Sequence, residues 1–311
     1  MEKIVTICEM APRDGMQVLN RNGQIPIAKR IELIKILQRA SLKYIEVGSF
    51  VNQKIIPAMK DTSELMKQVK SYNGQLAALV PNIKYFHEFE KAPNLDTVAL
   101  FLSASEYYSL KNTKMTIEQA INNAEEVVDI AAKKGYRLRA HLSGAFRDLT
   151  QENRPTQEEE VAEICSKLRH FDPELTIALA DTDGRAKEDD IERVLKYVIN
   201  TFGSAGIAVH LHNRNGDGLK KVRVAFDAGV NTFDSAIGGI GGNQKVLTEA
   251  VGNVATEEIV NMFETNGVKT GIDQNLLLEA GKLVIEMTEL TGDPLPPSKL
   301  LKRKLKEKVQ I

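Results

Sequence analysis

The stretch Ile207-Ala208-Val209-His210-Leu211-His212-Asn213 has the pattern of an apolar, partly β-branched strand that ends in two histidines. Side chains two residues apart on a strand point to the same face, so His210 and His212 present two imidazoles side by side. Paired imidazoles are natural metal ligands, although two locally hydrogen-bonded polar residues would give the same pattern. The stretch therefore predicts a buried strand that ends in either a metal-binding pair or two structural histidines.

Short apolar strand patterns alternate with amphipathic helical patterns along most of the 311 residues. One helical stripe, for example, is formed by Ile27, Ile31, Ile34 and Leu37. The predicted strands span residues 4–8, 44–47, 76–80, 97–103, 137–142, 176–180, 207–212 and 232–237. Repeated β-then-α units imply parallel strands, and eight such units can close into a (β/α)8 barrel.

An open, doubly wound sheet is the alternative to a barrel. It would normally carry a glycine-rich dinucleotide turn after the first strand, and Ala11-Pro12-Arg13-Asp14-Gly15 is not one. We therefore predict an α/β protein with a (β/α)8 TIM barrel over residues 1–250. Helical patterns continue after the eighth strand, so residues 251–311 are predicted to add C-terminal helices that pack on the barrel.

The composition limits the partners that the chain is expected to have. Forty-one basic and 42 acidic residues leave it near neutral, which indicates no nucleic-acid or anionic-membrane partner. No apolar run approaches the ~20 residues that span a bilayer. The two cysteines, Cys8 and Cys165, lie in a strand and a helix pattern, as expected for reduced core residues of a cytoplasmic protein.

Polar residues recur where each predicted strand ends, and active sites of barrels lie at that rim. These residues are Arg13 and Asp14, Glu46, Asn82, Ser105 and Glu106, His141 and Ser143, Asp181 and Thr182, His210 with His212 and Asn213, and Asp234 with Ser235. Each alone could be a helix cap or half of a buried ion pair. Their joint placement at one rim favours a functional site.

Three of these residues form a candidate metal site. Asp14, His210 and His212 offer one hard oxygen and two borderline nitrogens, which suit Mg²⁺, Mn²⁺ or another octahedral ion, whereas the lack of thiolates argues against structural zinc. Arg13 is either a charge partner of Asp14 or a donor to an oxyanion, a role in which one group is typically worth ~3 kcal/mol of barrier.

Several segments carry a resemblance to a known family over roughly residues 3 to 290. They are Arg13-Asp14-Gly15-Met16-Gln17, Ile45-Glu46-Val47-Gly48-Ser49-Phe50-Val51, Val80-Pro81-Asn82, Ser103-Ala104-Ser105-Glu106, Asp181-Thr182, His210-Leu211-His212 and Gly252-Asn253-Val254-Ala255-Thr256-Glu257. The chain resembles the 3-hydroxy-3-methylglutaryl-CoA lyases, which belong to a metal-dependent superfamily of barrel lyases and Claisen-condensing enzymes.

The resemblance implies a site residue by residue. The implied ligands of a divalent cation, Mg²⁺ or Mn²⁺, are Asp14, His210, His212 and Asn253. Arg13 would steady an enolate, and Glu46 would hold Arg13. The residues expected to face an acyl-CoA substrate are Gln17, Asp181, Thr182 and Asn243. A homodimer is also consistent with the resemblance.

One position departs from the family pattern. The family's catalytic cysteine lies in the glycine-rich loop after the eighth strand, where this chain has Asn243. An amide cannot replace a thiol in proton transfer. The candidate acid/base groups are therefore Asp14 and His141, although a hydrogen-bonded wall residue is the simpler interpretation of His141.

These observations predict a metal-dependent retro-Claisen lyase that acts on a 3-hydroxyacyl-CoA. Hydroxymethylglutaryl-CoA is the default substrate, with acetyl-CoA and acetoacetate as products. A 2-oxo-acid aldolase or an acetyl-CoA-dependent condensing enzyme is the second hypothesis, because Asn213 follows the two histidines as in condensing relatives. A non-catalytic acyl-CoA-binding protein is the third.

Overall fold

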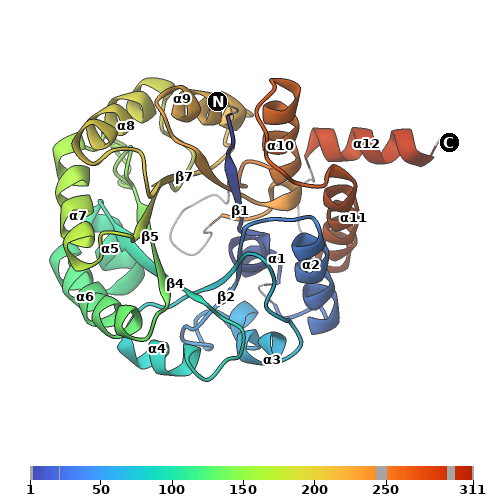
Figure 1. Cartoon of the computed structure of the whole chain (residues 1–311), viewed down its shortest axis with the longest axis horizontal. Helices are drawn as coiled ribbons and strands as arrows, with labels where there is room; N and C mark the ends of the chain where they lie inside the picture. Colours follow the sequence, from blue (N-terminus) through green and yellow to red (C-terminus); the bar gives the residue numbers. More distant parts are fainter. Residues whose placement is uncertain (1–2, 21, 243–250, 293–297, 310–311) are drawn as a thin grey trace.

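The protein folds as a closed eight-stranded barrel surrounded by helices, as the computed structural model shows for residues 3–20, 22–242, 251–292 and 298–309 (Figure 1). The strands pair in chain order, all in parallel, and β8 pairs with β1 to close the ring. The predicted α/β class, the (β/α)8 barrel and the additional C-terminal helices are confirmed.

The eight strands agree with the predicted ranges to within a few residues at each end. They are β1 (Thr6–Glu9), β2 (Tyr44–Ser49), β3 (Gln75–Leu79), β4 (Thr97–Ser103), β5 (Arg137–Ser143), β6 (Thr176–Asp181), β7 (Ile207–Leu211) and β8 (Thr232–Ser235). Three short helical turns lie after strands β1, β2 and β8. They are η1 (Ala11–Gly15), η2 (Pro57–Met59) and η3 (Ile237–Gly239), respectively.

The described helices cover the outside of the barrel. They are α1 (Met16–Leu19), α2 (Ile27–Arg39), α3 (Thr62–Met66), α4 (Ile83–Phe89), α5 (Glu106–Thr113), α6 (Ile117–Lys133), α7 (Glu158–Phe171), α8 (Glu188–Phe202), α9 (Gly218–Asp227), α10 (Thr256–Thr265), α11 (Gln274–Thr291) and α12 (Lys299–Val309). None of the described helices combines the length and the apolar composition that crossing a bilayer requires.

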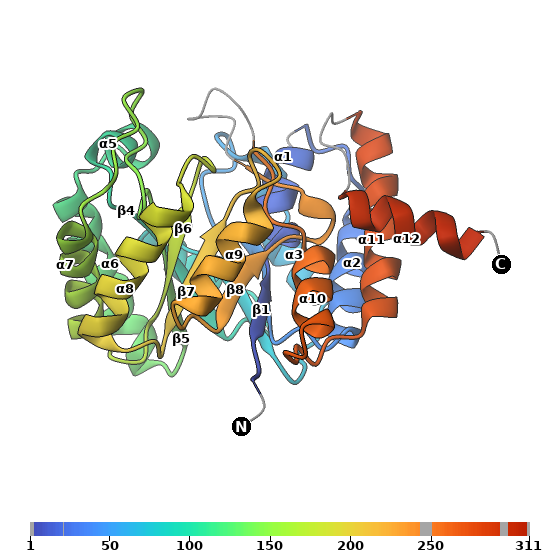
Figure 2. The same cartoon turned by 90° about the horizontal axis from the view of Figure 1, so that it is seen from above.

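The C-terminal helices differ in how closely they join the barrel. Helix α11 packs against α2, and α10 packs against η3 and α9. Helix α12 projects away from the barrel in both views (Figures 1 and 2). Its Leu301 is nevertheless fully buried, which fixes the start of α12 to the protein body. The division of the chain at residue 250 remains a prediction.

Alternation along the strands places polar side chains inside the barrel. Apolar residues such as Ile45 and Val209 belong to the main core, which the strands share with the surrounding helices. Their neighbours Glu46 and His210 point the other way and are also buried. The barrel interior therefore contains a buried polar cluster, and it lies below the rim at which the strands end.

Candidate metal centre and active site

The two histidines of β7 lie together, as the spacing predicts. His210 and His212 are 6% and 3% exposed, and their Nε2 atoms are 3.2 Å apart. Nδ1 of His212 donates to the carbonyl oxygen of Val251 at 2.7 Å, and Nδ1 of His210 donates to Oδ2 of Asp234 at 3.1 Å. In the tautomer in which each ring carries its proton at Nδ1, both Nε2 lone pairs are free and face one point.

Asp14 and Asn253 complete the cluster. The ligand atoms of Asp14, His210 and His212 lie within 4.8 Å of one another. Nδ2 of Asn253 donates to Oδ2 of Asp14 at 2.7 Å, while Oδ1 of Asn253 is buried without a hydrogen-bond partner among the described residues. An orphaned buried oxygen beside two free imidazole nitrogens and a carboxylate fits a cation site. The structure thus brings the four predicted ligands together.

The first part of the glycine-rich loop covers this cluster. Gly241 has a φ of +133°, and a Cβ there would lie 2.1 Å from Nδ2 of Asn253 and 2.5 Å from Oδ2 of Asp14. The amide of Gly242 donates to the same carboxylate oxygen at 3.3 Å. Only glycine allows the backbone to approach so closely in this conformation. Asn243, which was predicted to face substrate, lies outside the described residues.

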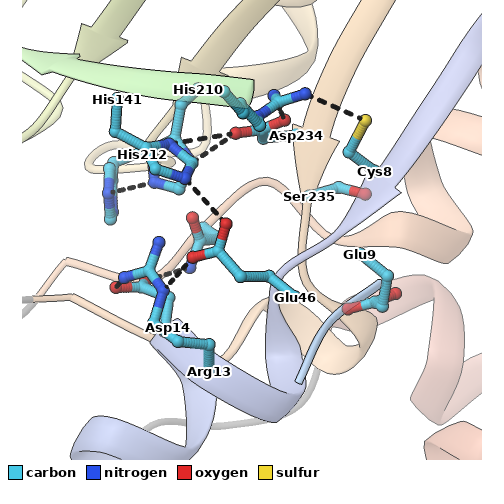
Figure 3. A network of polar contacts seen from close by, with 12 residues as sticks. Cys8, Glu9, Arg13, Asp14, Glu46, His141, His210, His212, Asp234 and Ser235 are labelled. Carbon is cyan, nitrogen blue, oxygen red and sulfur yellow. Dashed lines mark hydrogen bonds and ion pairs between the residues drawn. The ribbon is translucent and has the colours of Figure 1, made fainter. Parts of the chain in front are cut away.

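Arg13 lies beside the cluster and is held by two carboxylates. Its Nη1 donates to Asp14 at 3.0 Å, and its Nε donates to Oε1 of Glu46. Figure 3 shows Glu46 between Arg13 and the histidines. Oε2 of Glu46 accepts from the Tyr44 hydroxyl at 2.9 Å and contacts Nε2 of His141 at 2.8 Å. Glu46 therefore links the predicted enolate-binding arginine to His141.

The carboxylates of this cluster are ionised. Burial alone would raise the pKa of Glu46, but Arg13 and His141 hold it well below its usual range. Burial opposes ionisation of Asp14 as well, yet Arg13 and the two ligand histidines lower the pKa of Asp14 to about 2. For His212, burial and then the neighbouring His210 lower the pKa to about 4, so this ring is neutral. A neutral imidazole and charged carboxylates are the protonation states that bind a cation.

The residues predicted to face substrate are less close to the centre. Asp181 accepts from Nζ of Lys221 on α9 at 3.0 Å and from the amide of Ala186, in the loop after β6, at 3.0 Å. No contact of Asp181 with the two histidines is found among the described residues. The Thr182 hydroxyl accepts from the amide of Gly144 at 3.1 Å. Gln17 is half-buried on α1. Substrate contact by these three residues remains a prediction.

Two further residues of the cluster were not assigned roles from the sequence. Arg139 of β5 donates from Nη2 to Oδ1 of Asp234 on β8, and Asp234 also reaches His210. Strand alternation was the available signal, because Arg139 lies two residues before His141 and Asp234 lies in a buried strand.

Comparison with known proteins identifies the family. A family model described as HMGL-like matches residues 4–284. A hydroxymethylglutaryl-CoA lyase of Bacillus subtilis is 33% identical over 299 residues, which cover 96% of this chain and 97% of that protein. A human protein named cytoplasmic 3-hydroxy-3-methylglutaryl-CoA lyase is 32% identical over 292 residues, 94% of this chain and 77% of the relative.

A solved structure has the same fold. An HMG-CoA lyase from Acinetobacter baumannii, in complex with coenzyme A and 3-methylmalate, superposes with a TM-score of 0.87 at 30% identity. The match covers 96% of this chain and 94% of that one. The chain therefore belongs to the HMGL-like family, as the resemblance of its motifs predicts.

Proposed function

We propose that the chain is a divalent-metal-dependent carbon–carbon lyase that cleaves a 3-hydroxyacyl-CoA by retro-Claisen chemistry. Hydroxymethylglutaryl-CoA is the default substrate and Mg²⁺ or Mn²⁺ the cation. The observation that carries the proposal is the convergence of two free imidazole nitrogens, the Asp14 carboxylate and the unpartnered Oδ1 of Asn253 next to Arg13. The lyase names of the relatives, and the coenzyme A bound to one of them, support the substrate class.

The donor set fits the proposed cation. The residues that would hold it are Asp14, His210, His212 and Asn253, a mixture of oxygen and imidazole donors without thiolate. When bound, the cation would polarise the C3 hydroxyl oxygen of the substrate and fix its orientation.

Arg13 is proposed to stabilise the departing thioester enolate. When the C2–C3 bond breaks, its electron pair moves to C2 and the thioester, while the C3 oxygen becomes a ketone. Protonation of C2 then releases acetyl-CoA and, from the default substrate, acetoacetate. Because Glu46 and Asp14 fix Nε and Nη1, the guanidinium is oriented before substrate arrives, which is the condition for effective electrostatic stabilisation.

The hydroxyl proton of the substrate needs an acceptor from this chain. Two groups are proposed, Asp14 and His141. Asp14 lies within the ligand cluster, whereas His141 is joined to Arg13 only through Glu46. A His141→Gln variant separates them, because loss of a general base changes the pH dependence of kcat and loss of a wall residue does not.

The test is turnover of hydroxymethylglutaryl-CoA with Mn²⁺ by Arg13→Ala and His210→Ala. We expect either change to lower kcat by about 10²- to 10³-fold or more while far-UV circular dichroism stays unchanged. Arg223→Ala, which removes an exposed arginine of α9, is the control and keeps full activity. Substantial remaining activity in Arg13→Ala would reject the assignment.

A substrate panel distinguishes the remaining hypotheses. Cleavage of 2-oxo acids, or condensation of acetyl-CoA with them, would favour an aldolase or a condensing enzyme. Tight acyl-CoA binding without turnover would favour a non-catalytic homologue. Asn243→Cys should raise hydroxymethylglutaryl-CoA cleavage if that is the substrate, and an unchanged rate would favour another acyl group.

The proposed function includes three expectations about the protein's setting. We propose a cytoplasmic enzyme without nucleic-acid or membrane partners, a homodimer, and a catalytic barrel over residues 1–250 followed by a helical extension over residues 251–311. Sedimentation equilibrium tests the dimer. Expression of residues 1–250 alone tests whether the barrel folds without the extension.

A further inference from the structure

An ion pair lies inside the barrel behind His210, on the opposite side of the ring from the proposed cation. Oδ1 of Asp234 accepts from Nη2 of Arg139, and Oδ2 of Asp234 accepts from Nδ1 of His210 at 3.1 Å. The side chains of Arg139 and Asp234 are 4% and 0% exposed. Asp234 therefore acts on its surroundings through buried side chains and not through direct contact with solvent. Figure 3 shows Asp234 beside His210.

We propose that Asp234, held in place by Arg139, is a positioning residue of the metal centre that keeps the proton of His210 on Nδ1 and so leaves Nε2 free to bind the cation. This inference rests on the proposed metal-dependent function. A neutral imidazole carries one proton, and only the nitrogen without it can bind a metal. An ionised carboxylate only accepts hydrogen bonds, so it selects the Nδ1–H form of the ring.

The two ligand histidines are oriented in the same way by different groups. Nδ1 of His212 donates to the backbone carbonyl of Val251, which is a fixed acceptor. His210 lies deeper in the barrel and uses the Asp234 side chain instead. Unlike a backbone carbonyl, the Asp234 side chain can rotate, and its hydrogen bond with Arg139 fixes its orientation.

Arg139 is itself fixed from more than one side. Its guanidinium lies 4.7 Å from the centre of the Tyr44 ring, and its Nη1 lies 3.6 Å from Sγ of Cys8. A permanent positive charge beside Asp234 keeps that carboxylate ionised inside the barrel. Arg139 therefore fixes both the position and the negative charge of the Asp234 carboxylate.

The same residues also approach the geometry of a second cation site. Ligand atoms of His141, His210 and Asp234 lie within 4.8 Å of one another. The guanidinium of Arg139 already occupies one oxygen of Asp234, however, and its charge opposes a second cation at that position. The structure therefore assigns Asp234 to orientation of His210 and not to metal binding.

The test is isothermal titration of the metal-free protein with MnCl₂. In Asp234→Asn the amide oxygen is needed by Arg139, which can only donate, so the amide nitrogen faces Nδ1 of His210. The ring proton then moves to Nε2 and blocks the ligand position. We expect the Kd for Mn²⁺ to rise about 10- to 100-fold. The matched control is Asp190→Asn, which alters another buried carboxylate that pairs with an arginine, Arg147, at 2.7 Å but lies on α8 outside the barrel. Its Kd should stay within about twofold of the wild-type value.

A second variant keeps the test decisive if Asp234→Asn does not fold. Arg139→Lys retains the charge but not the planar contact, and we expect a rise of about three- to tenfold in Kd. Thermal unfolding without Mn²⁺ reports any general structural cost separately. An unchanged Kd in folded Asp234→Asn would overturn the role of Asp234, and an unchanged Kd in Arg139→Lys would overturn that of Arg139. Absence of Mn²⁺ binding by the wild-type protein would instead overturn the metal centre itself.

Discussion

Two buried glutamates of neighbouring strands have opposite surroundings. Glu46 on β2 and Glu9 on β1 are both 0% exposed. Glu46 contacts the charged Arg13 and the imidazole of His141. Among the described residues, the donors to Glu9 are neutral: the amides of Ala11 and Ile237 and the hydroxyl of Thr256. Burial opposes ionisation of both groups, but Arg13 and then His141 hold the pKa of Glu46 well below its usual range, whereas burial raises the pKa of Glu9 to about 7.

The difference in partners indicates that Glu46 is a charged functional group, whereas Glu9 has a structural role. Glu9 joins the start of η1, the turn at η3 and the start of α10. These segments adjoin Asp14, Gly241 and Asn253, respectively, so Glu9 supports the candidate metal centre without touching it. Figure 3 shows Glu9 apart from the histidines. Equal burial therefore does not imply an equal role, because the charge of the partners decides whether a carboxylate stays ionised.

The largest expected effect is that of Glu46→Gln on turnover. Glutamine has no negative charge to orient Arg13, and its amide nitrogen would face either Nε of Arg13 or the Tyr44 hydroxyl with His141. We therefore expect kcat to fall about 10²- to 10³-fold. Glu9→Gln, the matched change, should cost less than about tenfold. Steady-state assays with hydroxymethylglutaryl-CoA measure both, and equal losses would remove the distinction between the two glutamates.

The next effect is that of Gly241→Ala on metal affinity. The new Cβ would meet Asn253 and Asp14 in a backbone conformation that suits glycine, so we expect the Kd for Mn²⁺ to rise about tenfold or more. Gly229→Ala is the control, because Gly229 also has a positive φ, +106°, but its nearest neighbour lies 4.0 Å from the added atom. Isothermal titration measures both variants, and similar affinities would show that the loop does not close on the site.

Glu9→Gln should also change how stability depends on pH. The folded pKa of Glu9, about 7, lies above its ordinary value of 4.5, so the folded state keeps a proton that the unfolded state has already lost. The stability that this group contributes is present below about pH 4.5 and is lost as the pH rises to about 7, by at most about 3 kcal/mol. Urea unfolding at about pH 5 and pH 8 should show a larger decrease for the wild type than for Glu9→Gln. If the free energy of unfolding of both proteins changed equally with pH, the raised pKa of Glu9 would be contradicted.

The smallest effect is expected for Thr256→Val. The hydroxyl of Thr256 donates to Glu9 at 2.7 Å and lies 2.8 Å from the Ser235 hydroxyl, and valine keeps the shape but removes this donor. We expect a loss of about 1–2 kcal/mol in the free energy of unfolding, and a larger loss at the pH where Glu9 is ionised. Equal losses at pH 5 and pH 8 would contradict a charge on Glu9.

Most of the barrel and three of the four candidate ligands follow from local sequence patterns. Alternating strands and helices predict the closed sheet, and parallel strands bring their ends to one rim, where Asp14, His210 and His212 meet. Asn253 came only from the resemblance. An isolated antiparallel bridge pairs it with His212, and no local pattern reveals a contact of that range.

The direction of each side chain explains why positions at the strand ends did not identify every residue of the site correctly. Asp181 ends β6, but its side chain lies on the helix-facing side and pairs with Lys221. Arg139 and Glu9 precede the rim and were not singled out, since a buried charge in a strand becomes informative only when its partner is known. Counting alternate positions inward from His141 would have found Arg139.

The measurement that tests the central claim most directly is anomalous diffraction from crystals grown with Mn²⁺. We expect one strong peak in contact with Nε2 of His210, Nε2 of His212, the carboxylate of Asp14 and Oδ1 of Asn253, beside the guanidinium of Arg13. A peak bound instead by His141 and Asp234, or no peak at this end of the barrel, would contradict the account.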